Sequence, residues 1–175
     1  MSDRKLRLYA GTINRHPDTE EWHNLHLDAS PRDIWDPELE RPVAPDFVAN
    51  LADELPMFAD DTFDEIVCHH VLEHMTYGQA TLALRAMYRV LKPGGSLDVE
   101  TPDMQRIAEG WVNKTYTESD LQQWIHGEDL GGDFDGHRYS WSADSLAKLL
   151  RQEGFKHGQR EETGLAVRYV AHKPT

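Results

Sequence analysis

The stretch FDEIVCHHVLEHM (residues 63–75) decides the fold, because it combines a buried strand with a polar turn. Its first half, Phe63–Cys68, is an apolar run of strand length that contains β-branched residues, which suits a parallel sheet covered on both faces. The turn Cys68-His69-His70 follows directly. Because open α/β sheets bind ligands beyond the carboxyl ends of their strands, this turn is a candidate binding site.

The chain after this stretch alternates between helix and strand. Residues Gln79–Leu91 carry apolar side chains at helical spacing, and Pro93-Gly94-Gly95 ends that helix. Ser96–Glu100 is the next predicted strand. Ser142 is a plausible N-cap for a helix that runs to Glu153. The two runs that flank Thr163-Gly164 predict an antiparallel hairpin: Lys156–Glu162 and Leu165–His172.

The chain before residue 63 is predicted to supply three further strands. They are Leu6–Ala10, Leu25–Leu27 and Asp46–Leu51. Between the first two, the segment from Gly11 to Leu25 is too short for a loop, a full helix and a return loop, and Pro17 interrupts it. A proline-rich link precedes the third strand.

These elements predict one α/β domain over residues 1–175. Strands that alternate with helices and end in a hairpin indicate a three-layer sandwich, with a Rossmann-like, mostly parallel sheet and an antiparallel C-terminal hairpin. The segment at about residues 104–139 has no strand pattern, and within it residues 117–126 predict a short helix. An insertion at the carboxyl end of a core strand is a natural place for a substrate lid.

Composition excludes some classes of partner and favours others. The formal net charge of −13 is a poor match to a phosphate backbone, so we expect no nucleic-acid partner. The same negative charge disfavours an anionic membrane surface, so we expect no membrane partner. No apolar run is long enough to cross a bilayer, and no apolar leader follows the charged N-terminus. Cys68 is the only cysteine. A cytoplasmic protein is the expectation.

Several motifs, in this order and spacing, resemble the class I S-adenosylmethionine (SAM)-dependent methyltransferases. The motifs are DDTFDEIV (60–67), HVLEH (70–74), RVLKPGG (89–95), TPD (101–103) and WSADSL (141–146). The similarity is best over residues 46–103 and extends over residues 141–172. It implies SAM as the cofactor and methyl transfer to a small-molecule or saccharide acceptor. The chain departs from the family where a glycine-rich turn and a helix normally follow the first strand.

The resemblance implies cofactor contacts at the ends of the first four strands. Backbone at Ala10, Gly11 and Thr12 can approach the ligand closely. Asp28, after the second strand, can accept from the ribose hydroxyls. The remaining candidates are Asn50 and Leu51 for the adenine, His69 near the methionine part, and Arg15 for the carboxylate. Asn50 stands where the family commonly has an acidic residue, and Arg15 has the simpler interpretation of a solvated loop charge.

An oxygen acceptor needs a general base within hydrogen-bond reach. The candidates are His137, His70, Asp103 and His126, and His137 ranks first because it lies in the lid-like segment beside Arg138 and Tyr139. A surface loop histidine is the simpler interpretation of His137. The aromatic residues of this segment could form a stacking wall for the acceptor or could pack the segment onto the core.

We predict no metal site, although two sets invite one. Cys68, His70 and His74 lack a fourth partner for structural zinc. Asp133, Asp135 and His137 offer ligands that suit magnesium or calcium.

Two other functions remain open. The chain could be a catalytically eroded methyltransferase fold that acts as a binding or scaffold protein, since the glycine loop is missing. It could also use decarboxylated SAM or non-methyl chemistry. A second copy could cover an apolar patch on the short first half, so a homodimer is a further hypothesis.

Overall fold

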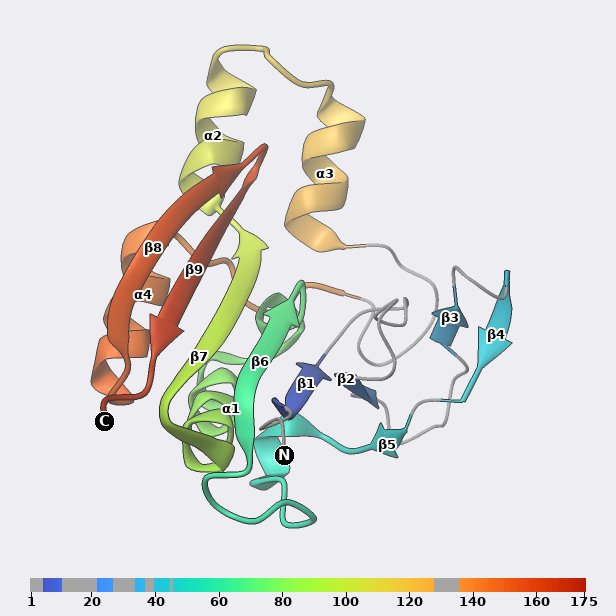
Figure 1. Cartoon of the computed structure of the whole chain (residues 1–175). Coiled ribbons are helices and arrows are strands. Elements are labelled where there is room, and N and C mark those ends of the chain that lie inside the picture. The colour runs from blue at the N-terminus through green and yellow to red at the C-terminus, as the bar shows by residue number, and fades with distance from the viewer. Residues whose placement is uncertain (1–4, 11–21, 27–33, 37–39, 45, 128–135) are drawn as a thin grey trace.

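The computed structural model describes residues 5–10, 22–26, 34–36, 40–44, 46–127 and 136–175. Its main sheet has seven strands in the order β5-β2-β1-β6-β7-β9-β8 (Figure 1). The strands are β1 (Arg7–Ala10), β2 (Trp22–His26), β5 (Phe47–Val48), β6 (Phe63–His69), β7 (Leu91–Pro102), β8 (Lys156–Thr163) and β9 (Ala166–His172). A separate hairpin pairs β3 (Ile34–Asp36) with β4 (Arg41–Val43).

Five of the strands run parallel and the last two form the hairpin. The strand β1 pairs in parallel with β2 on one side and β6 on the other, and β5 and β7 extend the parallel set outward. The strand β9 is antiparallel to both β7 and β8. The predicted α/β class, with a mostly parallel Rossmann-like sheet and an antiparallel C-terminal hairpin, is confirmed.

The two helices that pack on the sheet begin at clear sequence signals. In α1 (Tyr77–Val90), the Thr76 side chain accepts from the backbone N–H of Gln79, whose side chain returns the bond in a capping box. Ser142 and Ser145 cap α4 (Ala143–Gln152) in the same way. The short 3₁₀ turns η1 (Leu51–Asp53) and η2 (Leu72–His74) follow β5 and β6. Both predicted helices are therefore confirmed.

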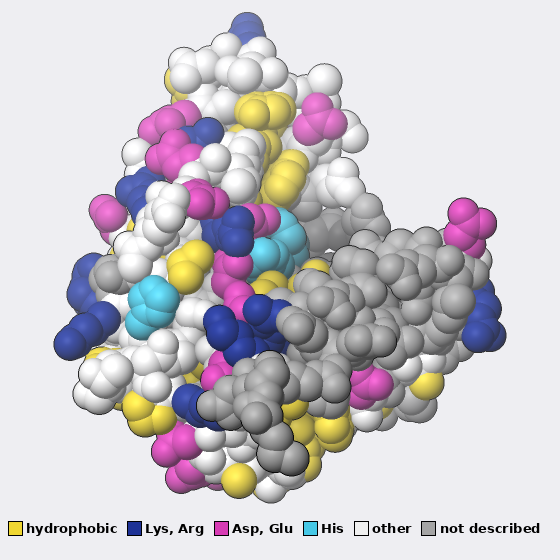
Figure 2. Space-filling model, viewed as in Figure 1, with side chains coloured by type: hydrophobic (Ala, Val, Ile, Leu, Met, Phe, Trp, Pro, Cys, Tyr) yellow, Lys and Arg dark blue, Asp and Glu magenta, His cyan; other side chains and the backbone are white. Residues whose placement is uncertain are grey.

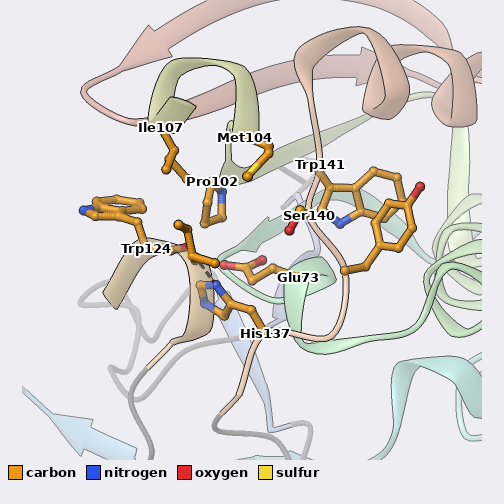
Figure 3. A pocket seen from close by; sticks show the side chains of 10 residues that line it. Glu73, Pro102, Met104, Ile107, Trp124, His137, Ser140 and Trp141 are labelled. Atoms are coloured by element: carbon orange, nitrogen blue, oxygen red, sulfur yellow. Dashed lines mark hydrogen bonds between the residues drawn. The ribbon is translucent and has the colours of Figure 1, made fainter. Parts of the chain in front are cut away.

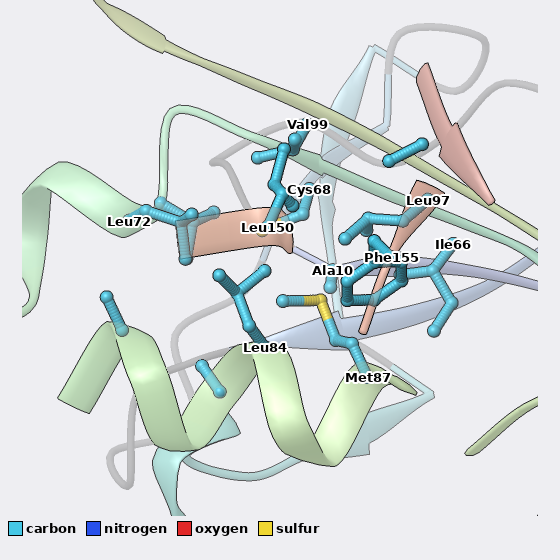
Figure 4. Packing of buried hydrophobic residues seen from close by; sticks show 14 of the residues in the cluster. Ala10, Ile66, Cys68, Leu72, Leu84, Met87, Leu97, Val99, Leu150 and Phe155 are labelled. Carbon is cyan, nitrogen blue, oxygen red and sulfur yellow. The ribbon is translucent and has the colours of Figure 1, made fainter. Parts of the chain in front are cut away.

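The core lies between these helices and one face of the sheet. Alternate strand residues such as Ile66, Leu97 and Val99 point to this face and are fully buried. Leu84 and Met87 of α1 meet them (Figure 4). The Tyr169 hydroxyl of β9 donates to the Ala143 carbonyl oxygen, which ties the hairpin to α4. In Figure 1 both helices lie behind the sheet.

The opposite face of the sheet is charged rather than apolar. Arg168 donates to both carboxylate oxygens of Asp98, at 2.7 and 2.5 Å, and Arg7 pairs with Glu65 at 3.0 Å. Charged side chains of both signs gather on this face in Figure 2. No helix in the described part of the chain covers it, and the alternation of apolar and charged residues along β7 agrees with one buried and one polar face.

The segment predicted as a lid contains two helices beyond the carboxyl end of β7 (Figure 1). The helix α3 (Glu118–His126) matches the predicted short helix, with Thr117 as its N-cap. The helix α2 (Met104–Val112) was not predicted. Ile107, Leu121 and Leu165 form a small second core between them. Residues 128–135 lie outside the described residues, and the role of the segment as a lid stays a prediction.

Several strand boundaries differ from the sequence analysis. The strand predicted at Leu25–Leu27 is β2, which begins at Trp22 and ends at His26. The predicted strand at residues 46–51 contains only Phe47–Val48, because Asn50 accepts from the backbone N–H of Ala52 and begins η1. The strand β7 extends beyond the predicted Ser96–Glu100 at both ends. Its pairing with β6 is irregular across Pro93-Gly94-Gly95, where Gly94 has φ of 82°. Among the described helices, none is long and apolar enough to span a membrane.

Candidate functional site

The candidate site is the edge of the sheet where the parallel strands end. The chain runs outward from β1 to β2 and β5 on one side, and from β6 to β7 on the other. The carboxyl ends of β1 and β6 are therefore neighbours at the point where the strand order reverses. In open α/β sheets this switch point is the preferred place for a nucleotide-like ligand.

Four of the predicted cofactor contacts cannot be placed at this edge. Gly11, Thr12, Arg15 and Asp28 lie outside the described residues. Ala10 ends β1 and is buried at the edge itself, next to Leu25 of β2 in the parallel register.

Asn50 and Leu51 follow β5 at the same edge, but their side chains are already engaged. The Asn50 side-chain oxygen caps η1 by accepting from the backbone N–H of Ala52 at 2.9 Å. Its amide NH₂ is the part that could still donate to an adenine. The Leu51 side chain is fully buried in the core, so only its backbone could contact a ligand. Both assignments stay predictions.

His69 ends β6 on the charged face. Its Nε2 lies 3.0 Å from an Asp98 carboxylate oxygen. Burial opposes ionisation of Asp98, but hydrogen bonds from Arg168 and His69 outweigh burial and lower the Asp98 pKa to about 2. Arg168 also pairs with Glu161 of β8. The network fixes the His69 ring at the end of the strand.

His70 occupies the turn itself, with an unusual positive φ of 53°. Its Nε2 lies 2.9 Å from Glu100 and its Nδ1 lies 3.2 Å from Glu73. The hydrogen bond with Glu100, followed by that with Glu73, raises the His70 pKa to about 9. At neutral pH the ring is therefore a cation that donates from both nitrogens. A ring in this state is poorly suited to accept a proton.

Asp103 has a structural position at the start of α2. It is buried, and its Oδ1 accepts from the backbone N–H of Gln105 at 3.0 Å, which makes it the N-cap. Its backbone N–H donates to the Leu165 carbonyl oxygen. The carboxylate thus satisfies a helix terminus, and any role as a general base would compete with that bond.

His137 lines a small pocket beside the carboxyl end of β7 (Figure 3). Its Nδ1 lies 3.0 Å from the Trp124 carbonyl oxygen. Because a carbonyl only accepts, Nδ1 must carry the proton, and the neutral ring presents the Nε2 lone pair. Burial is the main cause that lowers the His137 pKa, with smaller effects of both signs from its neighbours. Among His70, Asp103 and His137, the last has the geometry that suits proton abstraction; His126 is exposed at the end of α3.

The rest of the pocket is mostly apolar and aromatic. Its lining comes from the end of β7, from α2 and α3, and from residues 137–141 (Figure 3). The lining residues are Glu73, Pro102, Met104, Ile107, Trp124, Ile125, His137, Tyr139, Ser140 and Trp141. Segments far apart in the sequence therefore build one site.

Glu73 is the residue that the sequence analysis missed. Its side chain is only 2% exposed and accepts from the Thr101 hydroxyl at 3.2 Å as well as from His70. Its backbone carbonyl oxygen accepts from the N–H groups of Arg138 and Tyr139, which anchors the segment that carries His137. The signal was present in the motif HVLEH, where a carboxylate directly follows two apolar residues of a buried turn.

Of the two metal sets considered from the sequence, the one with Cys68 does not form, and the one with Asp133 and Asp135 cannot be placed. Cys68 is fully buried in the core, and burial raises the pKa of its thiol, so it stays protonated and is a poor ligand. Asp133 and Asp135 lie outside the described residues. A different set does come together: Glu73, His74 and His137 offer ligand atoms that all lie within 4.8 Å of one another.

Comparison with known protein families gives a match over most of the chain. Residues 10–158 match the family model described as a methyltransferase domain. A ubiquinone/menaquinone biosynthesis C-methyltransferase, UbiE, of Marinomonas sp. is 36% identical over 121 residues, which are 67% of this chain and 44% of that protein. The protein of the same name from Vibrio cholerae is 35% identical over 121 residues, 67% of this chain and 43% of that protein. The chain thus spans less than half the length of these relatives.

Solved structures agree with the fold. A SAM-dependent methyltransferase of Methanosarcina mazei superposes with a TM-score of 0.65 at 14% identity, over 99% of this chain and 94% of that one. A 1,6-didemethyltoxoflavin-N1-methyltransferase of Burkholderia thailandensis, solved with 1,6-didemethyltoxoflavin and S-adenosylhomocysteine, gives a TM-score of 0.57 at 17% identity, over 98% of this chain and 72% of that one.

Proposed function

Because the chain belongs to the class I SAM-dependent methyltransferases, we propose that it transfers the methyl group of SAM to a small-molecule acceptor. The observation that carries the proposal is the sheet order, since it brings the ends of β1, β2, β5 and β6 to one edge at the switch point. The cofactor would lie across this edge, and the acceptor would enter from the pocket beside β7.

We assign the cofactor contacts to the predicted set at the ends of the first four strands. Backbone at Gly11 and Thr12 would lie against the amino-acid end, Arg15 would pair with its carboxylate, and Asp28 would accept from the ribose. The Asn50 amide would donate to the adenine, since its oxygen already caps η1. Bound SAM supplies an electrophilic methyl group. The chain's own task is to align the acceptor in line with it.

The acceptor is proposed to be a hydroxylated aromatic molecule. Pro102, Ile107 and Trp124 offer apolar and aromatic contact in the pocket, whereas a saccharide needs many polar partners. The relatives named as ubiquinone/menaquinone biosynthesis C-methyltransferases support a small-molecule acceptor. His137, with its free Nε2, would remove the proton from the acceptor hydroxyl. The apolar lining disfavours a saccharide acceptor, and the homodimer stays an untested hypothesis.

The test is methyl transfer from labelled SAM to a panel of phenols and hydroquinones, with S-adenosylhomocysteine as the measured product. We expect product with at least one aromatic acceptor, and we expect His137→Gln to reduce kcat by about 10²–10⁴-fold, as the loss of a general base does. His172→Gln, an exposed position at the end of β9, is the matched control and should leave the rate unchanged.

Three outcomes separate the alternatives. SAM binding without product from any aromatic acceptor would contradict the acceptor class. Absence of SAM binding would overturn the methyltransferase function and favour the binding or scaffold alternative. A product other than S-adenosylhomocysteine would favour decarboxylated SAM or non-methyl chemistry.

A further inference from the structure

Three potential metal ligands converge at one end of the pocket. Glu73 and His74 come from η2, and His137 comes from the irregular segment 137–140 that leads to α4. The His74 and His137 rings meet edge to face, with centroids 4.9 Å apart. Figure 3 shows the Glu73 carboxylate beside the His137 ring. One ligand atom from each residue lies within 4.8 Å of the other two.

The hydrogen bonds around the cluster leave at least one ring nitrogen of each histidine without a partner among the described residues. His137 Nδ1–H donates to the Trp124 carbonyl oxygen, so Nε2 keeps its lone pair. A backbone carbonyl bonded to the far nitrogen is the usual orienting partner of a metal-ligating histidine. His74 Nδ1 is buried and has no hydrogen-bond partner among the described residues. An orphaned buried nitrogen is rare in native proteins and points to a missing partner at this place.

The carboxylate is held in the same manner. Glu73 is 2% exposed, and His70 and Thr101 donate to its two oxygens at 3.2 Å each. Each oxygen has a second lone pair that these bonds do not use. The hydrogen bonds orient the carboxylate as outer-shell partners orient the ligands of known metal sites.

We propose that Glu73, His74 and His137 form a binding site for one divalent transition-metal ion of the Zn²⁺ type. Two imidazoles and one carboxylate are a donor set found in catalytic zinc sites, which keep a fourth position open. Two nitrogen donors out of three favour such an ion over Mg²⁺ or Ca²⁺. This site differs from both sets that the sequence suggested, because it takes Glu73 in place of Cys68 or of the aspartates near His137.

The geometry requires only a small closure. In a tetrahedral site with ligands at about 2.1 Å from the ion, two ligand atoms are about 3.4 Å apart. The observed limit of 4.8 Å is wider than this, so side-chain rotations would draw the ligands together. The open position would face the pocket. With the ion bound, His137 Nε2 is a ligand and no longer acts as a base. If the proposed function holds, an acceptor oxygen would take the open position, and the ion, in place of His137, would lower the pKa of its hydroxyl.

The experiment uses the untagged full chain, freed of metal by chelator and dialysis, without SAM or acceptor. Titration calorimetry with Zn²⁺ should give one site per chain, and Mg²⁺ should bind more weakly. Removal of an outer-shell partner of a metal ligand costs about 10- to 100-fold in metal affinity. The variants His137→Gln and Glu73→Gln remove a ligand itself, so each should weaken Zn²⁺ binding by at least that much. His126→Ala, an exposed histidine at the end of α3, should bind as the parent does.

A second measurement keeps the test independent of folding. Co²⁺ added to the metal-free protein should give the absorption of a four- or five-coordinate ion, and His74→Gln should remove it while the circular dichroism spectrum is unchanged. Zn²⁺ binding that is equal in the parent and in all three ligand variants, or Mg²⁺ binding that is tighter than Zn²⁺ binding, would overturn the proposal. Because no SAM is present, either result leaves the proposed methyl transfer untouched.

Discussion

The charged face of the sheet predicts a measurable role for Asp98 in stability. The residue is only 6% exposed. Its carboxylate accepts two hydrogen bonds from Arg168 and lies 3.0 Å from His69 Nε2. These partners lower the Asp98 pKa from 3.8 to about 2, against the effect of burial. Replacement of Asp98 by Asn keeps the shape of the side chain and removes its charge.

The magnitude follows from the pKa difference. At ~1.36 kcal/mol per pH unit, the lowering from 3.8 to about 2 corresponds to about 2 kcal/mol of stability. Because the pKa is lower in the folded state, this stability is present above the unfolded pKa and is lost as the pH falls through the folded pKa. Asp98→Asn should therefore be less stable by ~2 kcal/mol at neutral pH, and the difference should shrink between pH values of about 4 and 2.

The assay is urea unfolding of the parent and the variant, followed by circular dichroism, at neutral pH and at several acidic values. Asp61→Asn is the matched control, because Asp61 pairs with Lys173 at 2.7 Å but is 51% exposed. An exposed pair contributes ~0–1 kcal/mol. If Asp98→Asn costs no more than Asp61→Asn at neutral pH, the charged face does not stabilise the sheet as argued.

Three further predictions concern single positions. Cys68 should not react with a thiol reagent in the native protein, because burial, followed by the nearby Glu73 and Asp98, raises its pKa; rapid native reaction would contradict its place in the core. Gly158→Ala should cost ~1–3 kcal/mol in thermal unfolding, because a Cβ there would collide with the Val170 carbonyl oxygen. Gly78, in the first turn of α1, has open space around it, so the control Gly78→Ala should instead stabilise the protein by ~0.4–1 kcal/mol. If Gly158→Ala and Gly78→Ala changed the stability equally, the β8–β9 packing described above would be contradicted. Asn50→Ala should cost ~1 kcal/mol through loss of the η1 cap, and SAM affinity measured beside it should also fall.

The fold was largely predictable because its signals are local. The apolar period of α1, the proline-glycine stop after it and the strand β6 are all explicit in the sequence. Boundaries were harder. The predicted helix began at Gln79, but the capping box with Thr76 starts α1 two residues earlier, and that signal was available in the sequence.

The helix α2 was missed because Asp103, which is its N-cap, was interpreted as a candidate general base. Asp103 follows a strand and precedes a helix, and such a carboxylate can be either a base at a strand end or an N-cap. Its bond to the N–H of Gln105 favours the cap. Sequence alone does not distinguish these roles, because they require the same residue type at the same position.

The site was only partly predictable, since its contacts join distant segments. His137 was identified, but its orientation depends on the Trp124 carbonyl oxygen. The charge on His70 depends on Glu100, 30 residues away. Glu73 gains its importance by contacting Thr101 and the backbone of Arg138. None of these pairings has a sequence spacing that would reveal it.

The central claim is that the carboxyl edge of the sheet binds SAM although the usual glycine-rich turn and helix are absent from the sequence. Titration calorimetry of SAM into the purified chain tests this claim most directly. We predict saturable binding of one SAM per chain, with a dissociation constant in the range of about 1 μM to 1 mM that is typical of enzyme substrates. No heat of binding and no rise in melting temperature at millimolar SAM would contradict the account.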